Sequence, residues 1–315
     1  MVTIAEYDDV DPLAVLALNL TGLNFALTPE RAAAIRKLDR RPFPFFAIYA
    51  VENGVVMGQV AVYRLPLVTP NGREDVGGVC AVCTNPASGR QGIATRLLDE
   101  AHARMRADGL RFSTLGTSRH RVAHTLYKKH GYADVFAPVI LLIQTPRLPS
   151  PGPLCVRRAE NGQLNLADEL FHQAAAGWLG FAWRHASFLP MLVATGELGA
   201  GSVWLVWQRN RAVGYILADA APPLLTVHNI LLVEETDAGA ALAALAHELD
   251  TPYLQVRVDQ PPMADSLRSA LCPAEWASWS TFMVKPLTPE VTVEDARRLF
   301  GVDAQRFLCS AFDIT

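Results

Sequence analysis

The chain has 315 residues, of which 50% are hydrophobic and 19% are charged, with a formal net charge of −3. This composition is typical of a folded globular protein and excludes a disordered chain, a collagen-like fibre and a coiled coil. At roughly 150 residues per domain the length predicts two domains. The near-neutral charge argues against a protein that coats nucleic acid.

The first half alternates strand and helix patterns. In chain order we expect a strand at Thr3–Tyr7, helices at Pro12–Leu20 and Pro29–Leu38, strands at Phe45–Val51, Val55–Leu65 and Val76–Thr84, a helix at Gly92–Asp108, a strand at Arg111–Gly116, a helix at Arg119–His130 and a strand at Val135–Gln144. Thr28 is suited to the N-cap of the second helix, with Pro29 at its first position. This order predicts an α/β domain.

A proline-rich stretch, Thr145–Pro153, divides the chain near its middle and predicts an extended connector. We therefore expect a catalytic domain at 1–145, a linker at 146–153, and a second domain with a C-terminal tail at 154–315. The second half repeats the pattern, with strands at Leu154–Arg158, Val203–Gln208, Ala212–Ala218, Leu225–Val233, Tyr253–Val258 and Phe282–Pro286 and helices at Leu164–Ala176, Ala238–Glu248 and Ala264–Leu271. It predicts a second copy of the same plan.

The chain ends and the cysteines indicate a cytoplasmic protein. The N-terminus lacks the pattern of a signal peptide, and no apolar run reaches the about 18 residues that a membrane span needs. Five cysteines are too few for a disulfide framework. Cys80 and Cys83 form a C-x-x-C pair, but residues three apart on a regular strand face opposite sides. We therefore expect them in the core, with no metal bound.

Charge is unevenly distributed between the halves. Residues 1–145 carry 16 basic and 13 acidic side chains, whereas residues 146–315 carry 12 and 18. The basic half is therefore the better candidate for an anionic ligand. The alternative is a compositional bias, because 24 of the 28 basic residues are arginine.

A loop with two glycines, Gly89-Arg-Gln-Gly92, follows the strand that ends at Thr84 and leads directly into a helix. Such a loop directs free backbone N–H groups to one point at the positive end of the helix dipole, which favours a phosphate or pyrophosphate. Residues 88–131 carry a net charge of +6, which would attract a ligand with several phosphates. The alternative is an ordinary strand–turn–helix whose glycines only form the turn.

Two spaced motifs resemble the GNAT superfamily of acyl-coenzyme A-dependent N-acyltransferases. The first, V-x-x-x-P followed by (R/Q)-x-x-G-x-(G/A), falls on Val82, Pro86, Gly89, Gly92 and Ala94. The second, N-x-x-A-x-x-x-Y-x-x-x-G-(F/Y), falls on His120, Ala123, Tyr127, Gly131 and Tyr132. The sequence departs from the family at Gly89, usually Arg or Gln, and at His120, usually Asn. The resemblance implies an α/β fold of two tandem GNAT-like domains, each a mixed central sheet flanked by helices.

The resemblance also implies a function: transfer of an acetyl group from acetyl-CoA to a primary amine of a small molecule, by a monomer or homodimer that binds no nucleic acid. The residues that would bind the cofactor are Val82, Cys83, Thr84, Gly89, Arg90, Gln91, Gly92, Ile93, Ala94, Thr95, His120 and Ala123. A non-catalytic acyl-CoA sensor and a protein or peptide N-acetyltransferase are the alternatives.

Tyr127 would protonate the leaving thiolate, since a phenol has an unperturbed pKa of about 10. A core or rim tyrosine is the alternative. Glu74 and Asp75 are the nearest candidates for the general base. A position at a hairpin tip is the alternative for both, and a water chain or His120 is an alternative base.

The second half lacks these motifs. Its corresponding segment carries three carboxylates, Glu234, Glu235 and Asp237, which would repel a pyrophosphate, and the tyrosine is missing. We therefore expect a degenerate copy that does not bind coenzyme A. Five aromatic residues either shape an acceptor pocket or belong to the core: Trp178, Phe181, Trp183, Trp204 and Trp207. Whether the tail that ends Phe312–Thr315 reaches the active site is left open.

Overall fold

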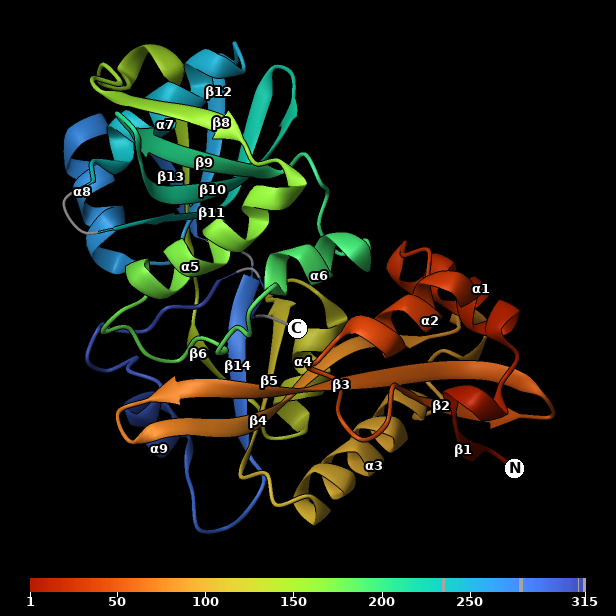
Figure 1. Ribbon diagram of the computed structural model, residues 1–315. Helices are drawn as coiled ribbons and strands as arrows, with labels where there is room; N and C mark the ends of the chain where they lie inside the picture. Colours follow the sequence, from red (N-terminus) through yellow and green to blue (C-terminus); the bar gives the residue numbers. More distant parts are fainter. Residues whose placement is uncertain (234–235, 278–279, 311, 314–315) are drawn as a thin grey trace. The chain divides into compact units, whose positions relative to one another are not determined.

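The chain forms two compact units, which the computed structural model describes except at residues 234–235, 278–279, 311 and 314–315 (Figure 1). Unit 1 comprises Met1–Phe136, Trp279–Phe300 and Phe312–Thr315, and unit 2 comprises Ala137–Ser278 and Gly301–Ala311. Each described unit is built on a seven-stranded mixed sheet with helices packed against it, which confirms the predicted α/β class. Among the helices that the structure describes, none is long and apolar enough to cross a membrane.

The sheet of unit 1 runs in the order β1 (Thr3–Glu6), β2 (Ile48–Glu52), β3 (Val55–Thr69), β4 (Gly72–Thr84), β5 (Phe112–Ser118), β14 (Ser280–Pro286) and β6 (Ala133–Phe136). β4 and β5 are parallel, and the other neighbours are antiparallel. The helices are α1 (Pro12–Leu23), α2 (Pro29–Leu38), α3 (Ile93–Ala107), α4 (Val122–Lys129) and α9 (Val293–Leu299). α3 packs into one hydrophobic cluster of the sheet, and α1 and α2 pack into another.

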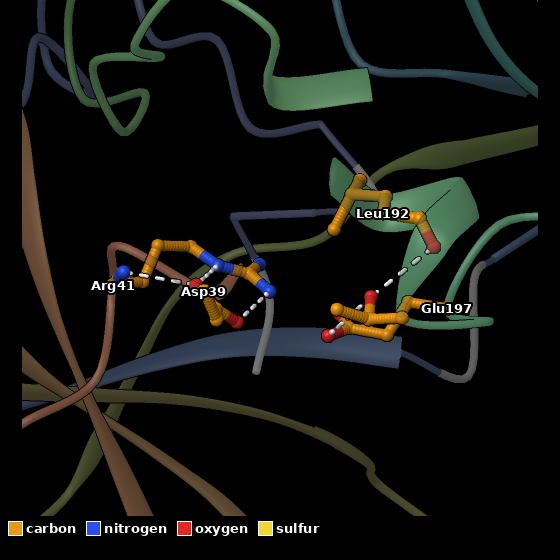
Figure 2. A network of polar contacts seen from close by, with 5 residues as sticks. Asp39, Arg41, Leu192 and Glu197 are labelled. Carbon is orange, nitrogen blue, oxygen red and sulfur yellow. Dashed lines mark hydrogen bonds and ion pairs between the residues drawn. The ribbon is translucent and has the colours of Figure 1, made fainter. Parts of the chain in front are cut away.

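Local sequence sets the limits of α2. Thr28 accepts a hydrogen bond from the Arg31 N–H and Pro29 stands in the first turn, so the predicted N-cap is confirmed. The helix ends at Asp39, whose buried carboxylate accepts bonds of 3.0 and 2.7 Å from Nε and Nη2 of Arg41 (Figure 2). Arg41 then accepts a backbone hydrogen bond from Arg64, which attaches the end of α2 to β3.

The sheet of unit 2 runs in the order β13 (Ala274–Ala277), β7 (Val139–Gln144), β12 (Tyr253–Val258), β11 (Leu224–Leu232), β10 (Arg211–Ala221), β9 (Val203–Gln208) and β8 (Leu154–Arg158). Its helices are α5 (Leu164–Ala174), α6 (Phe188–Ala194), α7 (Ala238–Glu248) and α8 (Pro261–Leu271). The alanine-rich α7 is buried from Gly239 to Ala246 and contributes much of the core.

Each sheet contains one strand from the opposite half of the sequence. In unit 1, β14 lies between β5 and β6, and its Phe282 pairs with both Gly116 and Phe136. In unit 2, β7 lies between β12 and β13, and its Leu141 pairs with Val256 and Glu275.

These exchanged strands make the units discontinuous in sequence, so the structure divides the chain differently from the boundary expected at residue 145. The single strand expected at Val135–Gln144 is two strands, β6 and β7, in different sheets. Pro138 lies between them, and proline lacks the N–H that a central strand requires.

Candidate active site

The two parallel strands at the centre of unit 1 pair over a very short distance. In the part of the chain that is described, β4 and β5 are in register only at Gly77 with Ser113 and at Gly78 with Thr114. Beyond this point β4 continues to Thr84, while β5 keeps its pairing with β14 on the other side. The strands therefore part and leave main-chain groups of β4 available to a ligand.

A β-bulge in β4 lies where the strands part. Its residue Ala81 has a φ of 50°, and the register with β3 shifts between Gln59 and Ala61. The buried amides of Asn19 and Gln59 exchange two hydrogen bonds of 2.9 Å, and Gln59 Nε2 also donates to the Ala81 carbonyl at 3.2 Å. This amide pair stabilises the bulge. Sequence patterns did not predict this pair, although both amides interrupt apolar runs.

The bulge changes the positions of the two cysteines. Cys80 is opposite Ala61 and Cys83 is opposite Gln59, so the two lie on the same face of the sheet. The expectation of opposite faces was therefore wrong, because it assumed a regular strand. Cys83 is buried against α1. A Cβ added to Gly22 of this helix would lie 2.8 Å from the Cβ of Cys83. Burial raises the pKa of Cys83 to about 12, so it offers a ligand only its main chain.

The glycine loop leaves the start of α3 without a side-chain cap. Gly92 stands at the N-cap with a φ of 74°, and a Cβ there would enter open space. Arg90 also has a positive φ, of 62°, and both residues are exposed. The first turn of α3 therefore has free N–H groups at Ile93, Ala94 and the exposed Thr95. No acidic side chain of this turn neutralises the positive end of the helix dipole. The loop fits a diphosphate.

Tyr127 projects from α4 into the core between α3 and the sheet and is 6% exposed. Burial, followed by the thiols of Cys80 and Cys83, raises the pKa of Tyr127 to about 12. Tyr127 belongs to the same hydrophobic cluster as Val79 and Val82 of β4 and Ile93 at the start of α3. The phenol remains protonated at neutral pH and is available as a proton donor.

The residues at the start of α4 and in the turn before it lie nearer to the surface than Tyr127. His120 is exposed at the turn before α4, and its N–H donates to Ser118 Oγ. Ala123 packs partly buried against the core. His124 Nε2 lies 3.0 Å from an Asp134 oxygen. This contact explains the orientation of His124 on α4.

Glu74 and Asp75 lie at the far end of β4. Glu74 accepts bonds of 2.9 and 2.6 Å from Nε and Nη2 of Arg111, and Asp75 lies 3.6 Å from Arg64. Ala81 lies six positions after Asp75 along β4, about 20 Å of extended chain. The structure therefore does not bring these carboxylates together with Tyr127, the loop and the end of β4.

A series of side-chain hydrogen bonds ends at Ser113 and Gly77, one of the two residue pairs that join β5 to β4. Lys285 Nζ donates to His102 Nδ1 at 3.3 Å, and His102 Nε2 then donates to Tyr132 Oη at 2.9 Å. Tyr132 donates to Ser113 Oγ at 2.7 Å, and Ser113 donates to the Gly77 carbonyl at 3.1 Å. These hydrogen bonds link β14, α3, β5 and β4 at the position where β4 and β5 still pair.

His102 belongs as well to a cluster that offers metal-ligating atoms. One ligand atom each of Asp99, His102 and His130 lies within 4.8 Å of the others. Lys285 places a positive charge against His102 Nδ1, and burial together with this charge lowers the pKa of His102 to about 3. His102 is therefore a neutral member of this series of hydrogen bonds, while His130 Nδ1 lies 3.4 Å from Asp99 Oδ1.

Unit 2 has a different helix start in the corresponding place. Asp237 caps α7 by accepting bonds from the N–H groups of Gly239 and Ala240, at 2.8 and 3.2 Å. The two other carboxylates that were expected to repel a pyrophosphate, Glu234 and Glu235, lie outside the described residues. So do Ile314 and Thr315 of the C-terminal tail.

The aromatic residues of unit 2 divide between core and surface. Phe181 and Trp204 are buried, whereas Trp183 is 40% exposed and Trp178 lines a cavity. Phe181 and Trp204 therefore belong to the core.

Unit 1 is thus an α/β domain in which two parallel strands part beside an uncapped helix and a buried phenol. Residues 15–135 match the family described as an acetyltransferase (GNAT) domain. No curated protein matches the chain in sequence.

Solved structures with the same fold are distant in sequence. A conserved protein of Enterococcus faecalis V583, described as a probable N-acyltransferase, is 15% identical with a TM-score of 0.70, over 91% of this chain and 72% of that one. A GCN5-related N-acetyltransferase from Kribbella flavida is 16% identical with a TM-score of 0.65, over 95% and 73%. Eis1 from Mycobacterium abscessus is 15% identical with a TM-score of 0.60, over 91% and 74%. These similarities extend the fold assignment to both units.

Proposed function

We propose that unit 1 transfers an acetyl group from acetyl-CoA to a primary amine of a small molecule. The observation that supports this proposal is that the buried Tyr127 shares a hydrophobic cluster with Val82 near the end of β4 and with Ile93 at the uncapped start of α3. Main-chain groups of Val82 and Thr84 would extend the sheet to the pantetheine arm. The N–H groups from Gly89 to Thr95 would hold the diphosphate.

Tyr127 acts as the general acid in this proposal. The amine nitrogen forms its bond to the acyl carbon, the carbon–sulfur bond breaks, and the sulfur takes the phenolic proton. Burial raises the pKa of Tyr127 to about 12. Burial likewise raises the pKa of the thiol that leaves, so the difference between the two pKa values stays small. The amine proton leaves through water, because Glu74 and Asp75 contact arginines at the far end of β4.

The experiment is acetyl-CoA titration by calorimetry, together with release of free thiol across a panel of small amines and peptides. Tyr127→Phe should slow turnover by about 100-fold and leave acetyl-CoA affinity within about twofold. Tyr253→Phe, at an exposed tyrosine of unit 2, is the matched control and should change neither quantity.

Each alternative outcome has a distinct meaning. Absence of saturable acetyl-CoA binding would exclude the proposed function. Binding without thiol release would favour an acyl-CoA sensor, and acetylation of peptides alone would favour a peptide N-acetyltransferase. An unchanged rate for Tyr127→Phe would remove the phenol from the mechanism.

A further inference from the structure

Unit 2 repeats the backbone geometry that positions the glycine loop of unit 1. In unit 1, Gly58 of β3 pairs with Thr84 at the end of β4, and in unit 2, Gly214 of β10 pairs with Leu232 at the end of β11. Neither glycine has room for a side chain, because an added Cβ would lie 2.9 Å from a carbonyl oxygen at Gly58 and 2.3 Å from one at Gly214. The two strand ends are therefore equivalent positions.

The first residue after each strand confirms the equivalence. The N–H of Asn85 donates to the Met57 carbonyl at 2.8 Å, and the N–H of Val233 donates to the Val213 carbonyl at 2.9 Å. β11 and β12 pair in parallel only as far as Val227, and β11 then continues beyond the pairing. Unit 2 thus has its own parted strands.

A cavity of about 750 Å³ lies at this place in unit 2. It extends from the β9–β10 hairpin and the end of α5 to the end of β11 and the start of α8, and Val213 and Leu232 line its inner part. This volume is within the range of cavities that hold small organic ligands.

The cavity lacks the phosphate-binding element of unit 1. Asp237 already occupies the N–H groups of Gly239 and Ala240 at the start of α7. A phosphate would have to displace this carboxylate and bind beside its negative charge. We therefore expect a ligand of this cavity to carry no phosphate where it faces the start of α7.

The polar lining consists mainly of carboxamides with one arginine. Gln173, Gln208 and Gln260 line the cavity, and Arg211 is the charged side chain among its described lining residues. Gln260 is 7% exposed, its side chain does not cap α8, and it lines the cavity. A carboxamide in a cavity wall both donates and accepts, so Gln260 is suited to pair with a bound molecule.

Apart from Thr236, the remaining described lining residues are apolar and include Trp178, Val213 and Met263. A guanidinium pairs best with a carboxylate, and a carboxamide, which both donates and accepts, pairs best with another amide.

We propose that unit 2 binds a small organic carboxylate that carries amide groups and no phosphate. Arg211 pairs with the carboxylate, Gln208 and Gln260 pair with the amides, and Trp178 covers the hydrocarbon part. The site is distinct from the acetyl-transfer site and does not depend on the activity proposed for unit 1.

Binding of N-acetyl amino acids and dipeptides to the full chain, measured by ligand-observed NMR, tests the proposal. At least one member should bind, and Arg211→Gln and Gln260→Leu should each weaken that binding by about tenfold. Arg209→Gln, at the neighbouring arginine that does not line the cavity, should bind like the wild type. Excess coenzyme A should leave this binding unchanged.

Three results would overturn the assignment. The first is that no member of the panel binds more tightly than about 1 mM. The second is binding that persists unchanged in both Arg211→Gln and Gln260→Leu while thermal unfolding shows both variants folded. The third is displacement by coenzyme A, which would place the bound compound in unit 1 instead.

Discussion

The starts of α3 in unit 1 and α7 in unit 2 share a backbone framework and differ in what satisfies the helix. At α3 the N-cap is Gly92, which contributes no side chain. At α7 the N-cap is Asp237, whose carboxylate accepts from two N–H groups of the first turn. A helix N-terminus favours negative charge whether a side chain or a ligand provides it. The fold therefore fixes an anion-binding position at this helix start. The N-cap residue determines whether a carboxylate of the protein occupies that position.

The largest effect should follow from giving unit 1 the cap of unit 2. Gly92→Asp places a carboxylate at the start of α3, where the side chain enters open space. We expect acetyl-CoA affinity to fall by at least about 100-fold, because the carboxylate competes for the N–H groups and repels the diphosphate. Calorimetric titration measures this change.

Gly92→Asn is the isosteric control for that substitution. It offers the same capping oxygen without the charge, and both residues tolerate a positive φ better than other side chains do. Equal affinities of the Asp and Asn variants would show that charge at this helix start does not govern binding.

The second prediction concerns the bulge, a feature of unit 1 that depends on a buried amide pair. Gln59→Leu leaves the Asn19 amide and the Ala81 carbonyl without their partner. We expect the free energy of unfolding to fall by about 2 to 3 kcal/mol and acetyl-CoA affinity to fall with it, because each buried unpaired group costs about 1 kcal/mol or more. Urea unfolding and calorimetry measure the two quantities.

The double variant Asn19→Leu/Gln59→Leu provides the control. With both partners apolar it should recover part of the lost stability. A single variant that is as stable as the wild type would contradict the role given to the amide pair.

The third prediction contrasts the response of the two units to acid. Burial and Lys285 lower the pKa of His102 in unit 1 to about 3, whereas burial raises the pKa of Asp168 in unit 2 to about 6. Below the ordinary histidine pKa of about 6.5 the unfolded chain takes up a proton that folded His102 does not, so stability falls as pH falls. Folded Asp168 takes up its proton at higher pH than the unfolded chain does, so stability rises as pH falls from 6 to 4.

Each group contributes at most about 1.4 kcal/mol per pH unit within its window. Hydrogen exchange at pH 6 and pH 4 should therefore show protection falling in unit 1 and rising in unit 2. His102→Gln should remove the first change and Asp168→Asn the second. Parallel responses of the two units in the wild type would contradict this contrast.

Local signals in the sequence predicted most elements and the glycine loop. Thr28 and Pro29 define the start of α2, and the strand and loop from Val76 to Gly92 were located from their pattern. The bulge at Ala81 could not be predicted in the same way, because it depends on amides far away in the sequence. The exchange of β7 and β14 is equally non-local: strand patterns identify strands but do not specify the sheet in which each one pairs.

The smallest effect should come from removing the cap of unit 2. Asp237→Ala leaves the Gly239 and Ala240 N–H groups without their side-chain acceptor, and loss of an N-cap typically costs about 1 kcal/mol. Acetyl-CoA titration should still give one site per chain, because unit 2 lacks the second glycine of the loop and the tyrosine of the second motif. Asp237→Asn, which keeps a capping oxygen, should be nearly as stable as the wild type. A second acetyl-CoA site in Asp237→Ala would mean that the carboxylate alone separates the two units in function.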